Sequence, residues 1–177
     1  MIAVLAFVGA LAAIVLVAVV VNRIRGGRAH YLDAWTPAPG ERTLWEDRRA
    51  DFYVVPRLGQ ARVMSFARRH RSHAVLTDRR LVVATRALLS RRYMITHMIL
   101  WEGVPDPPAE LGRLSGGLYS VGYIVMAARP ETARVEADGA RAYLRIVPEP
   151  TASGTNVEHC RLYSDDAAGL REAAVSG

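Results

Sequence analysis

The sequence predicts a mainly β domain: an antiparallel two-sheet barrel or sandwich, capped by a C-terminal α-helix and preceded by one transmembrane α-helix. Three observations lead to this prediction. Residues 1–21 are apolar throughout. From residue 51 onward, short β-branched and aromatic segments alternate with turn residues. The last residues have the pattern of an amphipathic helix. The 177 residues therefore leave about 155 for one domain with a modest core.

The first 21 residues contain no charged, amide or hydroxyl side chain. As an α-helix they would be about 31 Å long, enough to cross the hydrocarbon core of a bilayer. A positive flank of Arg23, Arg25 and Arg28 follows directly, and no arginine precedes the segment. Positive flanks stay in the cytoplasm, so we expect a single-pass protein of the cell (inner) membrane, with its N-terminus outside and its C-terminal domain cytoplasmic.

A cleaved signal peptide is the alternative for this segment. It would need positive charge before the apolar run and a small-residue cleavage site after it, and the sequence shows neither. The single cysteine, Cys160, also agrees with a reducing compartment.

The remaining chain divides into a linker and a domain. Residues 22–40 carry three Gly and two Pro and are predicted to form a juxtamembrane linker. The domain is expected over 41–177. Its predicted strands cover 51–56, 61–66, 73–77, 80–85, 91–101, 119–127, 132–137, 142–147 and 158–164.

The C-terminal helix is expected over 165–175. Ser164 is the predicted N-cap, and Leu170, Ala173 and Ala174 share one face. Because that face has no other core to join, we expect Leu170 to insert into the open end of the barrel.

Several segments resemble bacterial pleckstrin-homology-like (PH-like) domains, which are often found on membrane proteins. The similar segments are Gly40-Glu41, HAVLTDRRLVVAT at 73–85, RRYMITHMIL at 91–100 and the terminal helix. The resemblance covers about 41–175, and the Gly/Pro-rich break at 102–117 departs from it. It implies two near-orthogonal sheets closed by a helix, and a binding or scaffolding role without catalytic residues.

All 23 Lys+Arg residues are arginines. The absence of lysine excludes P-loop nucleoside triphosphatases, protein kinases and Schiff-base enzymes, since each needs a lysine. The net charge of +6 favours an anionic partner. Arginine suits phosphate oxygens, and a solvated surface is the alternative. The candidate residues for binding anionic lipid or a partner are Arg68, Arg69, Arg71, Arg79, Arg80, Arg91 and Arg92.

No catalytic or metal-binding motif emerges from the sequence. His70 and His73 have metal-ligand spacing, but no carboxylate or cysteine lies nearby to complete a set of four ligands. His159 and Cys160 are sequential on a strand, so their side chains should point to opposite faces. Asp78 is interpreted as a turn residue that caps its own backbone. We expect no enzyme, no cofactor and no metal.

The predicted function is a single-pass, membrane-anchored binding or scaffold module on the lipid bilayer. It would contact anionic phospholipid headgroups or another membrane protein. The alternative is a non-catalytic accessory subunit of an envelope or transport complex. Nucleic acid is not an expected partner, because 7% aromatic residues provide few platforms for base stacking.

Overall fold

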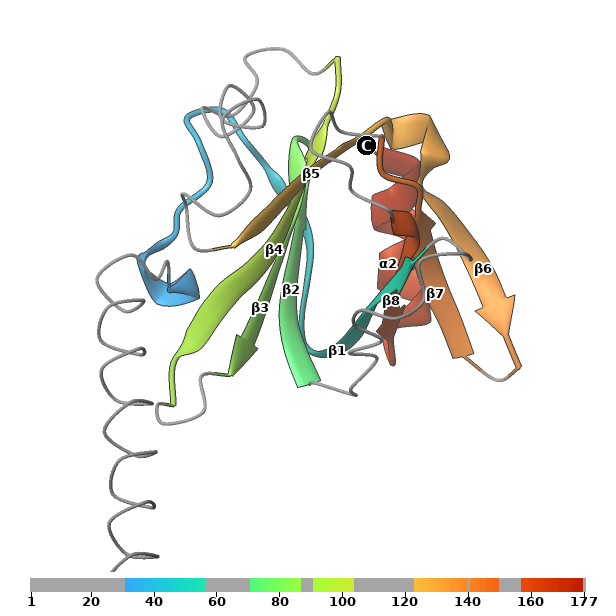
Figure 1. The fold of residues 1–177 in the computed structure, drawn as a ribbon, viewed down its shortest axis with the longest axis horizontal. Helices are drawn as coiled ribbons and strands as arrows, with labels where there is room; N and C mark the ends of the chain where they lie inside the picture. The colour runs from blue at the N-terminus through green and yellow to red at the C-terminus, as the bar shows by residue number, and fades with distance from the viewer. Residues whose placement is uncertain are drawn as a thin grey trace, which may run out of the picture.

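The computed structural model of the chain describes residues 31–56, 71–86, 91–103, 123–139, 141–149 and 157–176. They form one curled β-sheet and one α-helix (Figure 1). The strands are β1 (Thr43–Pro56), β2 (Arg71–Thr77), β3 (Arg80–Arg86), β4 (Tyr93–Trp101), β5 (Ile124–Ala128), β6 (Arg134–Asp138), β7 (Arg141–Ile146) and β8 (Val157–Ser164). The helices are the 3-10 turns η1 (Leu32–Ala34) and η3 (Pro130–Thr132), and α2 (Ala167–Ser176).

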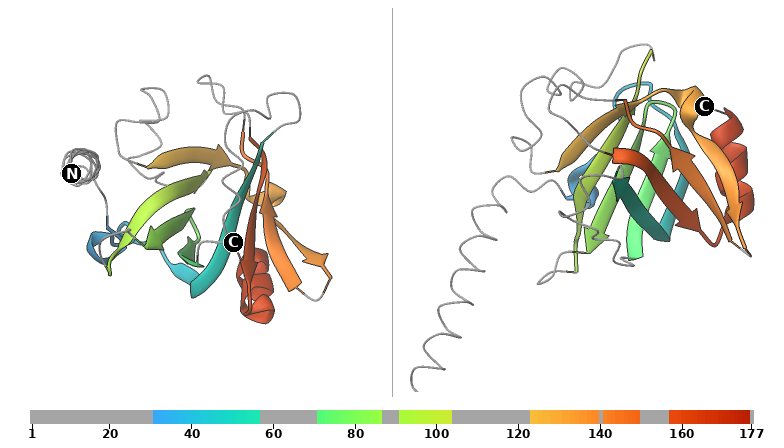
Figure 2. Two further views of the ribbon diagram at one scale, coloured as in Figure 1. Left: turned by 60° about the horizontal axis from the view of Figure 1, so that its bottom comes forward. Right: turned by 45° about the vertical axis from the view of Figure 1, so that its right-hand side comes forward.

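The eight strands follow the order β5-β4-β3-β2-β1-β8-β7-β6 within a single sheet. All neighbouring pairs are antiparallel except β4 and β5, which are parallel. The predicted two-sheet barrel or sandwich is therefore wrong in its arrangement, because one continuous sheet curls into a half-barrel instead (Figure 2).

The long strand β1 explains how one sheet forms two wings. Its first part, Thr43 to Asp51, pairs with β2, and its second part, Asp51 to Pro56, pairs with β8. Register shifts between Thr43 and Trp45 and between Asp47 and Ala50 each accommodate one extra residue in the first part. Such bulges bend a strand and increase its twist, so β1 turns the chain from one wing to the other.

The main core lies on the concave side of the sheet. Trp45, Leu81, Ile99, Leu144 and Leu162 belong to it and are at most 6% exposed. The helix α2 packs against β1, β6 and β7 (Figure 1). Its Leu170 is fully buried in this core, as predicted from the apolar face of the tail.

The start of α2 differs from the prediction in one detail. Asp166, and not Ser164, caps the helix, because its Oδ1 accepts the N–H of Gly169 at 3.0 Å. The Ser164 hydroxyl instead accepts the N–H of Asp166 and donates to Asp47. Trp45 adds a hydrogen bond from its Nε1 to Asp166, which ties the helix start to β1.

A second apolar cluster lies on the opposite face of β2 to β5, with Val82, Ala84, Met98 and Leu100 fully buried. Residues before the first strand pack against this cluster through Leu32 and Trp35. The linker expected over 22–40 thus includes residues that lie against the sheet, and its residues 22–30 fall outside the described part of the chain.

No helix in the described part of the chain combines the length and apolar character needed to cross a membrane. The described helices are two three-residue 3-10 turns and the ten-residue α2. Residues 1–21 and the flank of Arg23, Arg25 and Arg28 lie outside the described residues. The structure therefore does not support the predicted single-pass membrane protein with a cytoplasmic domain, and we correct that prediction here.

Candidate anion-binding sites

The topology brings several arginines together at one end of the sheet, where β2 begins, β3 ends and β4 begins. Ser72 pairs with Thr85, so Arg71 and Arg86 are the next residues of their strands at that end. Arg86 pairs with Tyr93, which Arg91 and Arg92 directly precede. We call Arg71, Arg86, Arg91 and Arg92 the arginine end. Arg86 and Arg91 are exposed there.

Arg92 already has a partner within the protein. Its Nη2 and Nε lie 2.8 and 2.9 Å from the two carboxylate oxygens of Asp33, and its guanidinium lies 3.8 Å from the ring centroid of Tyr31. The hydrogen bond from Arg92 lowers the pKa of Asp33. Arg92 thus holds the segment that precedes β1, while half of its own side chain remains exposed.

Arg79 and Arg80 lie at the opposite end of the sheet, Arg79 in the β2–β3 turn and Arg80 at the start of β3. A seven-residue strand separates the two ends by about 20 Å, so the seven candidate arginines cannot form one surface. Arg80 is also only 3% exposed. Its predicted role in binding lipid or a partner does not agree with this burial.

Arg80 forms a buried ion pair with Glu41. Its Nη2 and Nε donate to the two carboxylate oxygens of Glu41 at 2.7 and 2.9 Å. Thr77 Oγ1 and the N–H of Ala38 donate to the same carboxylate at 2.6 and 2.7 Å. Burial alone would raise the pKa of Glu41, but these donors outweigh it and the pKa is lowered. The pair fastens the segment before β1 to the β2–β3 turn.

The turn itself is capped by Thr77 and not by Asp78. Thr77 Oγ1 accepts the N–H groups of Arg79 and Arg80 at 3.1 and 2.9 Å. Asp78 instead accepts the backbone N–H and the Nε of Arg42. The backbone of this turn is thus fixed locally by Thr77 and to the start of β1 by Asp78.

Of the other residues singled out in the sequence, some lie outside the described part of the chain, and His73 has a hydrogen-bond partner within the fold. Arg68, Arg69 and His70 lie outside the described residues. His73 lies 2.7 Å from Glu46 through its Nε2. Within the described segments, no three His, Cys, Asp or Glu side chains gather closely enough to hold a metal ion.

Two further titratable groups are held in uncharged forms by burial. Burial raises the pKa of the Cys160 thiol to about 12, so the thiol stays protonated at neutral pH. Burial also lowers the pKa of His97 to about 4, so its imidazole is neutral. Cys160 belongs to the concave core, whereas His159 points to the other face of β8.

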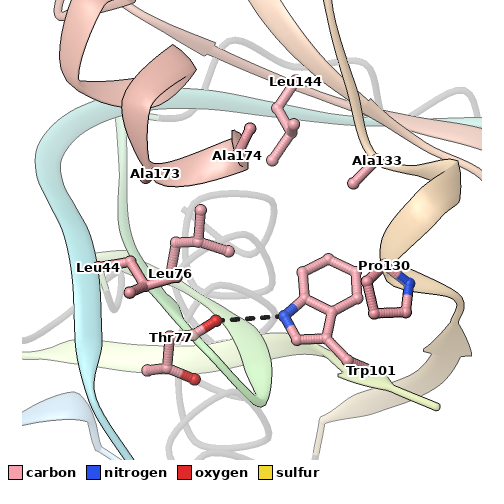
Figure 3. Close-up of a pocket in the computed structure, with 9 residues that line it drawn as sticks. All are labelled: Leu44, Leu76, Thr77, Trp101, Pro130, Ala133, Leu144, Ala173 and Ala174. Atoms are coloured by element: carbon pink, nitrogen blue, oxygen red, sulfur yellow. Dashed lines mark hydrogen bonds between the residues drawn. The ribbon is translucent and has the colours of Figure 1, made fainter. Parts of the chain in front are cut away.

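A small apolar pocket lies between α2 and the concave face of the sheet (Figure 3). Its volume of about 30 Å³ exceeds the space of one water but is far below the 300 Å³ or more of typical ligand pockets. Trp101 closes one side, and its Nε1 donates to the carbonyl of Thr77 at 3.2 Å. We therefore interpret it as a packing gap. The remaining lining residues are Leu44, Leu76, Pro130, Ala133, Leu144, Ala173 and Ala174.

Filling this gap should stabilise the fold. Ala133 lines it in an extended conformation, with φ −81° and ψ 113°, which suits valine. We expect Ala133→Val to raise the free energy of unfolding by about 0.5–1 kcal/mol, measured by urea denaturation. Ala137→Val is the matched control, because Ala137 is an exposed position of the neighbouring strand β6 and should change stability by less than about 0.5 kcal/mol. Destabilisation by Ala133→Val would mean that the pocket walls leave no usable space.

The structure also reveals a row of arginines that the sequence analysis missed. Arg134 pairs with Arg145, and Arg145 pairs with Arg161, on three neighbouring strands. The sequence neighbours of these arginines, Val135, Leu144 and Leu162, point into the concave core. Because side chains alternate along a strand, all three arginines lie on the opposite face. We call Arg134, Arg145 and Arg161 the arginine row. The sequence shows an arginine in each of these three strands. That the three lie side by side depends on the registers of the strands, which the sequence pattern does not specify.

Comparison of the chain with protein-family models, with curated proteins and with solved structures finds no match. The resemblance to PH-like domains stays a prediction drawn from residues 40–41, 73–85 and 91–100 and from the terminal helix.

Proposed function

We propose that this domain is a non-catalytic binding module that attaches to anionic phospholipid headgroups through the arginine end. The observation that supports this most is the convergence of Arg71, Arg86, Arg91 and Arg92 at one end of the wing formed by β2, β3 and β4. Strand ends form a blunt edge that can approach a flat surface. Among the described residues, the acids placed there are Asp33, paired with Arg92, and Asp51, opposite Arg71 in the register. Arginine therefore outnumbers acid at this end.

The expected affinity is low. Each arginine near an anionic surface contributes about 1 kcal/mol. Arg86 and Arg91 together would contribute about 2 kcal/mol. Arg92 would contribute less than about 1 kcal/mol, because its charge is already paired with Asp33. Attachment through this end alone is thus weak and reversible, and it should fade at high salt because exposed charges are screened.

The test is co-sedimentation of the protein with vesicles of phosphatidylglycerol and phosphatidylcholine. We expect binding to require phosphatidylglycerol. The double variant Arg86→Gln/Arg91→Gln should bind about 30-fold more weakly, which corresponds to the loss of about 2 kcal/mol.

The matched control is Arg129→Gln/Arg171→Gln, which removes two exposed arginines elsewhere. Both double variants lower the net charge from +6 to +4. Equal losses in the two variants would show that net charge alone drives binding, and would contradict a site at the arginine end. Equal binding to neutral vesicles would contradict it as well.

A further inference from the structure

We propose that the arginine row binds a soluble oligophosphate, a chain of linked phosphate groups that lies across β6, β7 and β8. This site is separate from the arginine end, because it lies on the other wing of the sheet. The inference does not depend on the proposed lipid attachment.

The first argument is the direct opposition of like charges. Neighbouring strands are about 4.8 Å apart, so three arginines in register on one face lie close together. Like charges directly opposite each other destabilise a sheet. Arg134–Arg145 and Arg145–Arg161 are two such pairs in succession. A bound polyanion would remove this repulsion.

The second argument is that the acids of this face are engaged mainly with other groups. Glu136 accepts the hydroxyl of Tyr143 at 2.5 Å, and Asp138 accepts that of Tyr163 at 2.8 Å. Asp51 pairs with Arg141 at 3.2 Å. The contact of Glu136 with the arginine row is long: its Oε1 lies 3.9 Å from the Nε of Arg145, at the outer limit of an ion pair.

The third argument is that Arg161 is pre-positioned by neutral groups. Its Nε donates to His159 Nε2 at 2.9 Å, and its guanidinium lies 5.1 Å from the ring centroid of Tyr143. These contacts fix the side chain without neutralising its charge. Burial, and then the charges of Arg161 and Arg145, lower the pKa of His159. The imidazole therefore stays a neutral acceptor for the Arg161 guanidinium.

The fourth argument concerns the shape of the ligand. Arg134 is exposed and the side chain of Arg145 is 33% exposed, so a solute can reach both. Tyr53 continues the row beyond Arg161 on β1. Glu136 and Asp138 flank the row on one side, and Glu158 lies 3.4 Å from His159 on the other. A flat anionic bilayer would meet these carboxylates as well. A narrow chain of phosphates can follow the row between them, and arginine forks suit its oxygens.

The test uses inorganic tripolyphosphate as the probe, with isothermal titration calorimetry and thermal unfolding as two readouts. We expect tripolyphosphate to bind at least tenfold more tightly than orthophosphate at equal ionic strength, because one phosphate cannot reach all three arginines. We expect it to raise the melting temperature, since a ligand of the native state stabilises that state.

The decisive variant is Arg134→Gln/Arg145→Gln, which spares Arg161 because that side chain packs on Tyr143. It should weaken tripolyphosphate binding at least tenfold and leave binding to phosphatidylglycerol vesicles within twofold. The controls Arg129→Gln/Arg171→Gln and Arg86→Gln/Arg91→Gln have the same net charge and should keep tripolyphosphate binding within twofold.

Three results would overturn the inference. Unchanged tripolyphosphate binding by Arg134→Gln/Arg145→Gln would remove the row as its site. An equal loss in the control variants would show unspecific charge attraction. A parallel loss of vesicle binding in the row variant would assign the row to lipid headgroups and not to a soluble oligophosphate. Failure of the lipid proposal alone, with tripolyphosphate binding retained, would leave the arginine row standing.

Discussion

Replacing Arg80 with methionine is expected to lower the free energy of unfolding by about 3–5 kcal/mol, because it leaves the Glu41 carboxylate buried without its cation. The Glu41 side chain is fully buried and the Arg80 side chain is 4% exposed. Thr77 and the N–H of Ala38 would still donate to the carboxylate, but neither carries charge. Urea denaturation of the protein at pH 7 measures the change.

The matched control is Arg42→Met, the same substitution at an arginine that pairs with Asp78 and is 76% exposed. Exposed ion pairs contribute little, so we expect a change below about 1 kcal/mol. A loss below 1 kcal/mol for Arg80→Met would show that the pair does not fasten the segment before β1 to the sheet.

The lowered pKa of Glu41 adds a pH signature to the same experiment. A carboxyl whose folded pKa lies below its ordinary value of 4.5 contributes stability above that value and loses it as pH falls toward the folded pKa. The stability difference between the protein and Glu41→Gln should therefore be constant near neutral pH and shrink below about pH 4.5. A difference that grows on acidification would contradict the lowered pKa.

Replacing Leu170 with alanine is the second large expected effect, a loss of about 2–5 kcal/mol in the free energy of unfolding. Leu170 is fully buried where α2 meets the concave core, and truncating its side chain leaves a cavity in that core. Thermal or urea denaturation would show the loss.

Leu170→Met conserves volume and helix propensity, so it should cost less than about 1.5 kcal/mol. If alanine and methionine have equal and small effects, α2 is peripheral to the fold and the interpretation of its packing is wrong.

Many of the strands could be predicted from the sequence, because their apolar residues are also the residues that the fold buries. RLVVAT became β3 because both faces of that strand are covered, which produces a continuous apolar run. The predicted strands 132–137 and 142–147 correspond to the paired strands β6 and β7, and Gly139 between them has a positive φ of 59°, which suits a tight turn.

The arrangement of the strands could not be predicted in the same way. The first half of β1 is rich in charged residues, and its bulge breaks the alternation that identifies a strand. The parallel pairing of β4 with β5 is a long-range contact, and nothing in the residue pattern of 102–123 specifies its direction. The sequence therefore predicted an antiparallel two-sheet barrel or sandwich, whereas the described strands form one bent sheet.

The same distinction applies to the candidate sites. Arg79 and Arg80 are adjacent in the sequence, yet the position of Glu41, 39 residues earlier, determines that Arg80 is buried. Within the arginine row, the Arg134–Arg145 pair follows from the hairpin turn between them. The Arg145–Arg161 pair depends on the register of β7 with β8 across a longer connection, which local pattern does not specify.

The most direct test of the central claim, that the arginine end attaches the domain to anionic headgroups, is amide NMR of the protein with nanodiscs containing phosphatidylglycerol. We expect signal loss concentrated at Ser72, Arg86, Arg91 and Arg92, weakened by salt and missing with neutral nanodiscs. Signal loss centred on α2 and the β2–β3 turn, or spread evenly over the described strands, would contradict the claim.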